Sequence, residues 1–446
     1  MPSGRLSGTK VIVAGAGLAG LTAARALDAD GAQVVVCEAR ARVGGRVHTI
    51  RDRFTKDQHA EAGADLIEES QQEVLDLAHE LRVQPERILR RGWGFYGVDG
   101  RGRRKVYVAP STFERAARLL KTEIRDYRLA GERWDSPVGR LLARRSVAEW
   151  FAKLETEKTL ASGLRGLRGF FLADPEDLSL LALVEQFASD GAPGDEKMFR
   201  LRGGTSRLPE AMAKTLSGRV LLNTVLRRVS QNDQSVRVSI EERGTSHELR
   251  GDFLIIAMPA STVRDVHFDP SLPEDQHRAI AKLRYGAATR LLLQFDRRFW
   301  RHRGRPWAFG TDLPIGAVWD GNEEQRGPSG IVSLLAGGRA SAELQEILAR
   351  EGERGVCERL AWLGRPTRLL ASYSVAWESD PWSRGGYAFF DPQFDPALRP
   401  WLSRPAGRIL FAGEHTSDRE QGYMSGAIES GKRAAVEIAA LKSLLD

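Results

Sequence analysis

The sequence has few cysteines, no long apolar run and no cluster of metal-binding residues. Its two cysteines, Cys37 and Cys357, lie far apart and form no C-x-x-C pair, which excludes a redox-active dithiol and indicates a reducing compartment. No stretch approaches the roughly 20 apolar residues that are needed to span a bilayer, and the chain starts without an apolar signal core. The eight histidines form no metal constellation. We therefore expect a cytoplasmic protein that binds neither a membrane nor a metal.

The basic residues are scattered along the chain. The net charge of +7 comes mostly from dispersed arginines, with only short clusters such as residues 101–105. Nucleic-acid-binding proteins usually concentrate positive charge on one element, so we expect no nucleic-acid partner. A length of 446 residues with 42% hydrophobic and 28% charged residues is typical of a globular protein of two or three domains.

Residues 10–38 have the pattern of a strand, a glycine-rich turn, a helix and a second strand. Gly15, Gly17 and Gly20 form the turn, in which they permit the tight bend, the approach of a pyrophosphate and the close packing of helix on strand. The helix N-terminus then offers free N–H groups to the phosphates. Glu38 lies 18 residues after Gly20 and is placed to accept hydrogen bonds from a ribose. This pattern predicts a bound dinucleotide, either FAD or NAD.

Three arginines follow the acidic residue. Arg40, Arg42 and Arg46 surround a glycine pair that ends at Gly45. Arginines beside a flexible backbone suit bidentate phosphate contacts, and the alternative is an ordinary charged surface loop. The sequence has no second G-x-G-x-x-G for NADPH. This indicates that the electrons come directly from an organic substrate, and it disfavours monooxygenases and disulfide reductases.

The rest of the chain alternates between β/α segments and helix-rich segments. The expected elements are a helix with an apolar stripe over residues 74–81, a hairpin over 95–108, helices over 113–127 and 175–187, strands at 219–223, 225–229, 235–240, 248–259 and 290–295, and a final helix from about Gly426. This alternation predicts one discontinuous cofactor domain and one substrate domain. We place the cofactor domain at residues 1–79, 196–265 and 371–446, and the substrate domain at 80–195 and 266–370, with helix-rich segments in both gaps.

Six motifs occur in order along nearly the whole chain. They are residues 38–46, 201–204, 255–259, 377–387, 410–416 and 422–431. In this order and at these distances they resemble the motifs of the flavin-containing amine oxidase family. The resemblance implies a mixed α/β fold, with a discontinuous Rossmann-type FAD-binding domain beside a substrate domain of mixed sheet and helices. It also implies oxidation of the C–N bond of an amine by hydride transfer to flavin N5, giving an imine, then a carbonyl, and hydrogen peroxide.

The same resemblance implies a noncovalently bound FAD. In monoamine oxidase a cysteine before the active-site tyrosine forms a thioether to the flavin, but here that residue is Gly386, which has no side chain to bond. A helix that starts near residues 422–426 would direct its positive end at the flavin and stabilise its reduced form. The positions that correspond to FAD contacts are Gly15, Gly17, Gly20, Glu38, Arg40, Arg42, Gly45, Arg46, Gly63, Ala64, Val225, Trp377, Trp382, Gly413, Glu414, Gly422, Tyr423, Met424 and Ala427.

Four residues are candidates for the substrate site. Tyr387 and Tyr423 match the two aromatic residues that flank the amine in monoamine oxidase, and the alternative is that both are core aromatics. Glu61 matches a position at which some polyamine oxidases bind a substrate cation, or else it braces the turn at Gly63. Arg290 stands where the family places a lysine that holds a water at flavin N5, and a guanidinium cannot act as a base.

Several roles are open for Arg290. It holds the water, alters the reactivity toward oxygen, binds a substrate carboxylate, or is a surface residue at a strand end. No motif identifies the residues that line the substrate pocket. The candidates, which could equally belong to the core, are Phe170, Phe171, Phe309 and Trp319.

The expected partners are a small-molecule amine and molecular oxygen, and a homodimer is one assembly open to the chain. The alternatives to an amine oxidase are an L-amino acid oxidase, a flavin-dependent desaturase or dehydrogenase of a secondary metabolite with poor oxygen reactivity, and a protein that holds FAD as a structural ligand.

Overall fold

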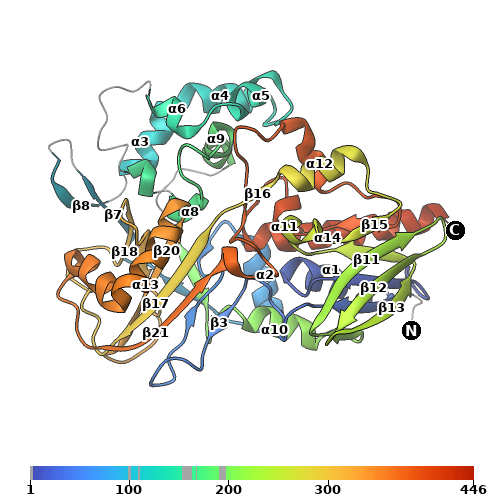
Figure 1. Ribbon diagram of the computed structural model, residues 1–446, viewed down its shortest axis with the longest axis horizontal. Coiled ribbons are helices and arrows are strands. Elements are labelled where there is room, and N and C mark those ends of the chain that lie inside the picture. Colours follow the sequence, from blue (N-terminus) through green and yellow to red (C-terminus); the bar gives the residue numbers. More distant parts are fainter. Residues whose placement is uncertain are drawn as a thin grey trace.

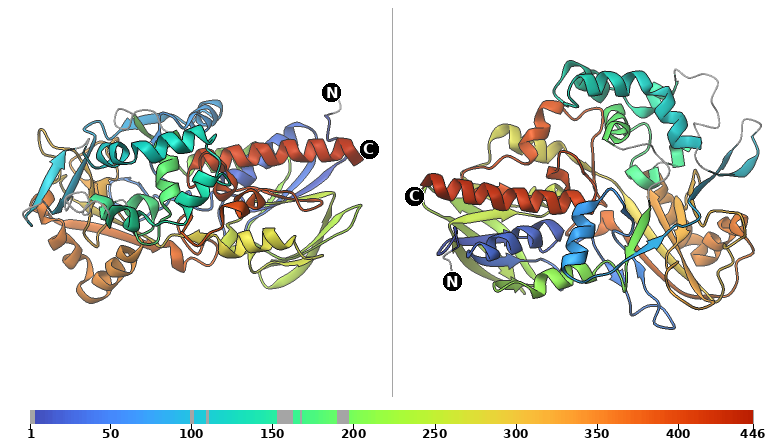
Figure 2. Two further views of the ribbon diagram at one scale, coloured as in Figure 1. Left: turned by 90° about the horizontal axis from the view of Figure 1, so that it is seen from above. Right: turned by 180° about the vertical axis from the view of Figure 1, so that it is seen from behind.

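The computed structural model describes residues 4–98, 102–108, 111–152, 163–166, 168–189 and 197–445. In Figure 1, helices α1 and α14 and strands β11–β13 lie on the right, together with both termini. Strands β17, β20 and β21 lie on the left with helix α13, and helices α3–α6 run along the top. The views from above and from behind show the same division (Figure 2).

The first βαβ unit forms as the sequence predicts. Strand β1 (Lys10–Ala14) leads into helix α1 (Leu18–Ala29), and β2 (Gln33–Cys37) pairs with β1 in parallel. Strands covered on both faces are continuous apolar runs, as here. Three more strands complete a parallel sheet in the order β10-β2-β1-β14-β23; they are β10 (Arg219–Leu221), β14 (Phe253–Ile256) and β23 (Ile409–Phe411). Distant segments of the chain therefore share one sheet.

Helix α14 (Met424–Leu445) packs along α1 (Figures 1 and 2). The two helices approach so closely that a Cβ added at Gly431 would lie 2.3 Å from the carbonyl oxygen of Ala19. Apolar residues of both helices share one core with the parallel sheet. Because each helix follows a strand of that sheet, both helix N-termini lie at its carboxyl edge, where the site is built.

A seven-stranded mixed sheet forms the other half. Its order is β21-β17-β20-β19-β18-β7-β8, and the bounds in that order are Leu369–Ala376, Ala288–Phe295, Gly330–Gly337, Ala317–Asp320, Ala308–Thr311, Trp93–Val98 and Arg104–Val108. Strand β17 is buried over its whole length. Helix α13 (Arg339–Arg359) packs against β17 and β20.

Smaller sheets and helices complete the described fold. The sheets are β13-β12-β11-β15 (Thr245–Gly251, Val236–Glu242, Thr224–Gln231, His267–Asp269), β5-β9-β6 (Ile67–Glu68, Met198–Leu201, Pro85–Ile88), β3-β4 (Thr49–Ile50, Ala60–Glu61) and β16-β22 (Arg284–Tyr285, Ala388–Phe389). The helices are α2 (Gln72–Glu80), α3 (Ser111–Leu119), α4 (Lys121–Leu129), α5 (Pro137–Ala143), α6 (Val147–Ala152), α8 (Arg168–Phe171), α9 (Leu180–Ser189), α10 (Arg207–Lys214), α11 (Ala260–Val263) and α12 (Glu274–Lys282), with the 3₁₀ helices η1 (Ala361–Leu363), η2 (Trp377–Ser379), η3 (Pro396–Leu402) and η4 (Glu414–Thr416).

The mixed α/β class is confirmed, as are most of the expected elements. Helix α2, strands β10–β12 and strand β17 occupy the predicted segments, and α14 begins at Met424, two residues before the predicted start. Strands β7 and β8 form the predicted antiparallel hairpin. The expected turn residues of this hairpin, Asp99 and Gly100, lie outside the described part of the chain.

Two predicted helices have different bounds. The segment 113–127 divides into α3 and α4, which meet at Leu120. Helix α9 begins at Leu180 and not at residue 175, because the preceding residues pair with another segment. Ser179 forms a β-bridge with Ser146, and Leu178 accepts a hydrogen bond of 3.0 Å from the N–H of Val147.

Two predictions about strands are wrong. Residues 248–259 form two strands in different sheets, β13 and β14, which separate at Asp252. The backbone N–H and carboxylate of Asp252 both bond the backbone of Lys10, at 2.7 Å each, and this redirects the chain. The gap 266–370 combines helices α12 and α13 with strands β15–β20, so it is mixed and not mainly helical. Short buried apolar runs have no periodicity that separates a strand from a helix.

The division into two domains stays a proposal. Strand β21 pairs with β17 of the seven-stranded sheet, so a boundary at residue 371 would divide one strand; we propose to place it after Ala376. Across the part of the chain that the structure describes, none of the helices combines the length and the apolar character that crossing a membrane requires.

Candidate active site

One cavity of about 1070 Å³ joins the two halves of the molecule. At one end it is lined by Gly15 and Cys37, at the carboxyl edge of the parallel sheet, and at the other end by Trp319 and Leu335 of the seven-stranded sheet. Ligands of open parallel sheets bind at this edge. The cavity therefore places a dinucleotide-type cradle and a second chamber in one continuous space.

The glycine-rich turn fits a phosphate. Gly15 has a φ of +113°, and a Cβ there would lie 2.6 Å from the carbonyl oxygen of Ala257, so the turn requires glycine. A Cβ added at Gly17 would meet no described atom within 4 Å and would enter the cavity that Gly17 lines. No described side chain caps the N-terminus of α1, so its first N–H groups remain for a ligand. Gly20 packs against Ala257 outside the cavity wall, as the third glycine should.

Glu38 is fixed by the backbone. Its carboxylate accepts hydrogen bonds from the N–H groups of Ala16 at 2.8 Å and Arg40 at 2.9 Å. Each carboxylate oxygen has a further lone pair, so Glu38 can also accept from a ribose hydroxyl in the cavity that it lines. Arg40 lines the same cavity and donates to Asp380 at 2.5 Å and to Ser383 at 2.8 Å.

The side chain of Arg42 turns toward its own loop. It does not belong to the described cavity lining, and it is only partly exposed. Its guanidinium donates to the carbonyl oxygens of Val43, Gly45 and Val47 at 2.9–3.2 Å. Burial, and then the neighbouring Arg40, lower the pKa of Arg42 to about 10. Arg42 therefore braces the turn whose backbone forms the cavity wall.

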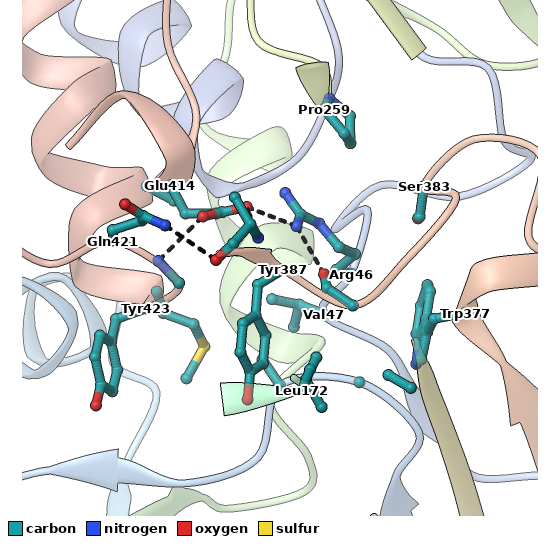
Figure 3. Close-up of a pocket in the computed structure, with 18 of the residues that line it drawn as sticks. Arg46, Val47, Leu172, Pro259, Trp377, Ser383, Tyr387, Glu414, Gln421 and Tyr423 are labelled. Carbon is teal, nitrogen blue, oxygen red and sulfur yellow. Dashed lines mark hydrogen bonds and ion pairs between the residues drawn. The ribbon is translucent and has the colours of Figure 1, made fainter. Parts of the chain in front are cut away.

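Glu414 connects three segments around the cavity (Figure 3). Its carboxylate accepts hydrogen bonds from Arg46 at 2.8 Å, from the N–H of Gly422 at 3.0 Å and from the N–H of Ala388 at 3.3 Å. Arg46 also donates to the carbonyl oxygen of Gly386 at 2.7 Å. One buried carboxylate thus ties the loop after β2 to strand β22 and to the start of α14.

The N-terminus of α14 faces the cavity. Gly422, Tyr423, Met424 and Ala427 line it, together with Gly413. Helix N-termini carry a partial positive charge, so this wall favours a group that becomes negative. The other positions that line the cavity as the resemblance implies are Gly45, Gly63, Ala64, Val225, Trp377 and Trp382.

Two tyrosine rings enter the same cavity and point the same way in Figure 3. The hydroxyl of Tyr387 donates to the carbonyl oxygen of Phe170, and its ring lies against Gly422, the neighbour of Tyr423. Burial raises the pKa of Tyr387, so its hydroxyl stays neutral. The indole N–H of Trp377 donates to the carbonyl oxygen of Ala62 at 2.9 Å, which fixes one wall of the chamber.

The backbone before Tyr387 runs close to its neighbours. Gly385 has a φ of +144°, and a Cβ added there would lie 2.6 Å from the Cβ of Tyr285. A Cβ added at Gly386 would lie 2.3 Å from Leu172 and 2.9 Å from Ala288. The site has no room for a side chain at the position of the thioether cysteine.

Glu61 braces the structure and is not among the residues that line the cavity. Its carboxylate accepts hydrogen bonds from the N–H of Thr205 at 2.9 Å and from the hydroxyl of Thr49 at 2.8 Å. Burial, and then the charge of Asp65, raise the pKa of Glu61 to about 7. Of the two interpretations from the sequence, the contacts favour the brace over the substrate anchor.

We expect Glu61→Gln to change how stability depends on pH. The folded protein retains the proton of Glu61 up to about pH 7, whereas the unfolded chain loses it near pH 4.3. Between pH 4.5 and 7 the unfolded chain releases this proton while the folded protein keeps it. The free energy of unfolding therefore falls by up to about 3 kcal/mol as the pH rises through this window. The unfolding free energy of the wild type minus that of the variant should fall over this window, as measured by urea unfolding. Parallel curves would show that Glu61 ionises normally.

Arg290 is buried, which excludes a surface position. It lies within β17 and lines the cavity with 5% of its surface exposed. Its guanidinium donates to Ser333 at 3.1 Å and to the carbonyl oxygen of Gly63 at 2.8 Å. Burial lowers its pKa.

The structure also separates the candidate pocket residues into those that line the cavity and those that lie in the core. Phe170, Phe171 and Trp319 line the cavity, whereas Phe309 is buried against Trp362 in the core behind the sheet. The sequence reasoning missed Asp65, Trp93 and Leu172, which also line the cavity. An aromatic residue beside a hairpin strand was the only signal for Trp93, and such a residue is usually core.

A dinucleotide cradle that opens onto an aromatic chamber is the arrangement of a cofactor-dependent enzyme. Residues 18–439 match the family of flavin containing amine oxidoreductases. The chain is 27% identical over 455 residues to the flavin-containing amine oxidase B of Sus scrofa, covering 96% of this chain and 85% of that protein. It is 28% identical over 461 residues to the L-amino acid dehydrogenase of Synechocystis sp., covering 96% and 94%.

The fold is similar to that of cyclohexylamine oxidase from Brevibacterium oxydans IH-35A. The TM-score is 0.85 at 22% identity, covering 98% of this chain and 99% of that chain. The chain belongs to the flavin-containing amine oxidoreductase family.

Proposed function

We propose that the chain binds FAD noncovalently and oxidises the C–N bond of a small-molecule amine to an imine, which hydrolyses to a carbonyl compound. When bound, FAD supplies the two-electron chemistry, in which hydride leaves the α-carbon for flavin N5 and molecular oxygen is reduced to hydrogen peroxide. The observation that carries this proposal is the single cavity that both the glycine-rich turn and the tyrosine pair line.

The chain's own residues would bind the cofactor and orient the substrate. The N–H groups of α1 and the turn at Gly17 would hold the pyrophosphate, and Glu38 would accept from the ribose. The start of α14 would place its positive end beside the flavin ring. Tyr387 and Tyr423 would hold the amine between ring faces, and the bond from Tyr387 to a backbone carbonyl keeps its ring in place. The imine would then leave through the same chamber.

The test measures the colour of the protein and asks whether FAD is attached to it covalently. Purified protein should be yellow, an amine substrate should bleach it without oxygen, and air should restore the colour with release of peroxide. Acid precipitation should leave the FAD in the supernatant, because Gly386 offers no atom for a thioether. Protein that stays colourless after incubation with FAD would contradict the whole proposal, and FAD that precipitates with the protein would contradict noncovalent binding.

A second candidate is a dehydrogenase with poor oxygen reactivity. The observation that favours it is Arg290, a buried cation at the position of the family's lysine. A guanidinium stays charged and cannot take up a proton as an amine does. Anaerobic bleaching that air reverses only slowly, but that an artificial electron acceptor reverses at once, would select this candidate.

A further inference from the structure

Arg290 is a buried cation whose hydrogen-bond partners are neutral. Both of its acceptors, the Ser333 hydroxyl and the Gly63 carbonyl, carry no charge. Among the described residues it forms no ion pair: Asp65 and Glu61 favour its charge without direct contact, and its Nε–H group has no hydrogen-bond partner. A buried charge without a counter-ion is costly. An anionic group of a ligand in the cavity would form the direct ion pair that Arg290 lacks.

The guanidinium is also held in one orientation. It lies over the ring of Trp319, 4.5 Å from the centroid. The indole N–H of Trp319 donates to Asp65 at 2.7 Å, and the other oxygen of Asp65 accepts from Arg200 at 2.6 Å. Asp65, the carboxylate that most favours the charge of Arg290, is therefore already engaged. Two of the five N–H donors of Arg290 are used, and the remaining ones suit a carboxylate in a bidentate arrangement.

An aromatic wall extends from Arg290 toward the tyrosine pair. We define the aromatic wall as Trp93, Phe170 and Trp319, which all line the cavity. The ring of Trp93 lies 6.2 Å from that of Trp319 and 5.2 Å from that of Phe170, both edge to face. Phe170 in turn accepts the hydrogen bond of Tyr387. The cation, the aromatic wall and the amine-flanking ring thus form one surface.

We propose that the substrate is an α-amino acid with a large apolar side chain, whose carboxylate Arg290 binds. The amine would lie between Tyr387 and Tyr423, and the side chain would contact the aromatic wall. The α-carbon gives a hydride to the flavin and the nitrogen loses a proton, which yields a 2-imino acid. Water then replaces the nitrogen, releasing ammonia and a 2-oxo acid. This inference rests on the proposed amine oxidation and assigns its substrate class.

The first test needs no turnover. Flavin-loaded protein is titrated with 3-phenylpropanoate, which has the carboxylate and ring but no amine, and binding is followed by the flavin absorbance. The wild type should bind it, and Arg290→Met should bind at least about 100-fold more weakly, because truncating one member of a buried charge pair has such effects. Arg290→Lys keeps the charge without the fork and should lose about 10-fold.

The second test compares two substrates that differ only in the carboxylate. Anaerobic bleaching by phenylalanine and by 2-phenylethylamine gives a selectivity ratio for each protein. The ratio should favour the amino acid in the wild type and fall by about 100-fold in Arg290→Met. Arg419 lines the same cavity but is exposed, so Arg419→Met removes an equal charge and should keep the ratio.

The outcomes separate this inference from the proposed function. Bleaching by 2-phenylethylamine but not by amino acids, without binding of 3-phenylpropanoate, would overturn the carboxylate site and leave amine oxidation standing. Yellow protein that no amine or amino acid bleaches would overturn both. If Arg290→Met slows both substrates equally, Arg290 serves as a counter-charge or holds a water, and the inference is wrong.

Discussion

Glu414→Gln should lower the free energy of unfolding by about 3 kcal/mol, because breaking a buried ion pair leaves one charge unpaired. The Glu414 side chain is 7% exposed and that of Arg46 is 23% exposed. The amide keeps the shape and can still accept a hydrogen bond from Gly422 or Ala388, so the loss reports the missing charge. Urea unfolding of flavin-free protein measures it without any contribution from FAD affinity.

The matched control is Glu210→Gln. Glu210 forms an ion pair with Arg51 at 3.0 Å, but both side chains are exposed to about 40%. Exposed pairs contribute about 0–1 kcal/mol. If the two variants lose equal stability, Glu414 does not hold the three segments together as its contacts indicate.

Gly17→Val should weaken the binding of FAD while leaving the fold intact. Gly17 has φ −75° and ψ −179°, which a β-branched residue adopts readily, and the added Cβ meets no described protein atom within 4 Å. The side chain would instead occupy the space that we propose for the pyrophosphate. FAD should bind about 100-fold more weakly, the upper range of overpacking costs, as measured by FAD titration of the stripped protein.

Two further variants serve as controls for this expectation. Gly17→Ala adds one methyl group and should weaken FAD binding less than valine. Ala29→Val places the same valine side chain at the exposed end of the same helix and should bind FAD normally. Yellow Gly17→Val with full FAD content would show that the phosphates lie elsewhere.

Local rules made the first βαβ unit predictable. Residues 10–38 combine a buried apolar run, a glycine turn and a helix, and each feature acts over a few residues. Five of the six motifs contribute residues to the lining of one cavity, whereas none of residues 201–204 is in that lining. Local pattern failed where a residue's neighbours come from distant segments. Glu61 accepts a hydrogen bond from Thr205, 144 residues further along the chain, and no local pattern indicates that contact.

Local sequence patterns do not predict the seven-stranded sheet either. Its strands come from residues 93–108, 288–337 and 369–376, and the pairing of distant strands depends on partners that no local window contains. Trp93 of this sheet and Leu172, which follows helix α8, both line the cavity, and no local pattern marks either residue for that position.

The sequence by itself determined the family, the dinucleotide turn and the identity of the unusual residue, Arg290. Only the tertiary structure decided that Arg290 is buried, that its hydrogen-bond partners are neutral, and that it faces the same cavity as the two tyrosines. The reason is physical: glycine turns and helix starts are set by neighbouring residues, whereas burial and charge pairing depend on which segments meet in space.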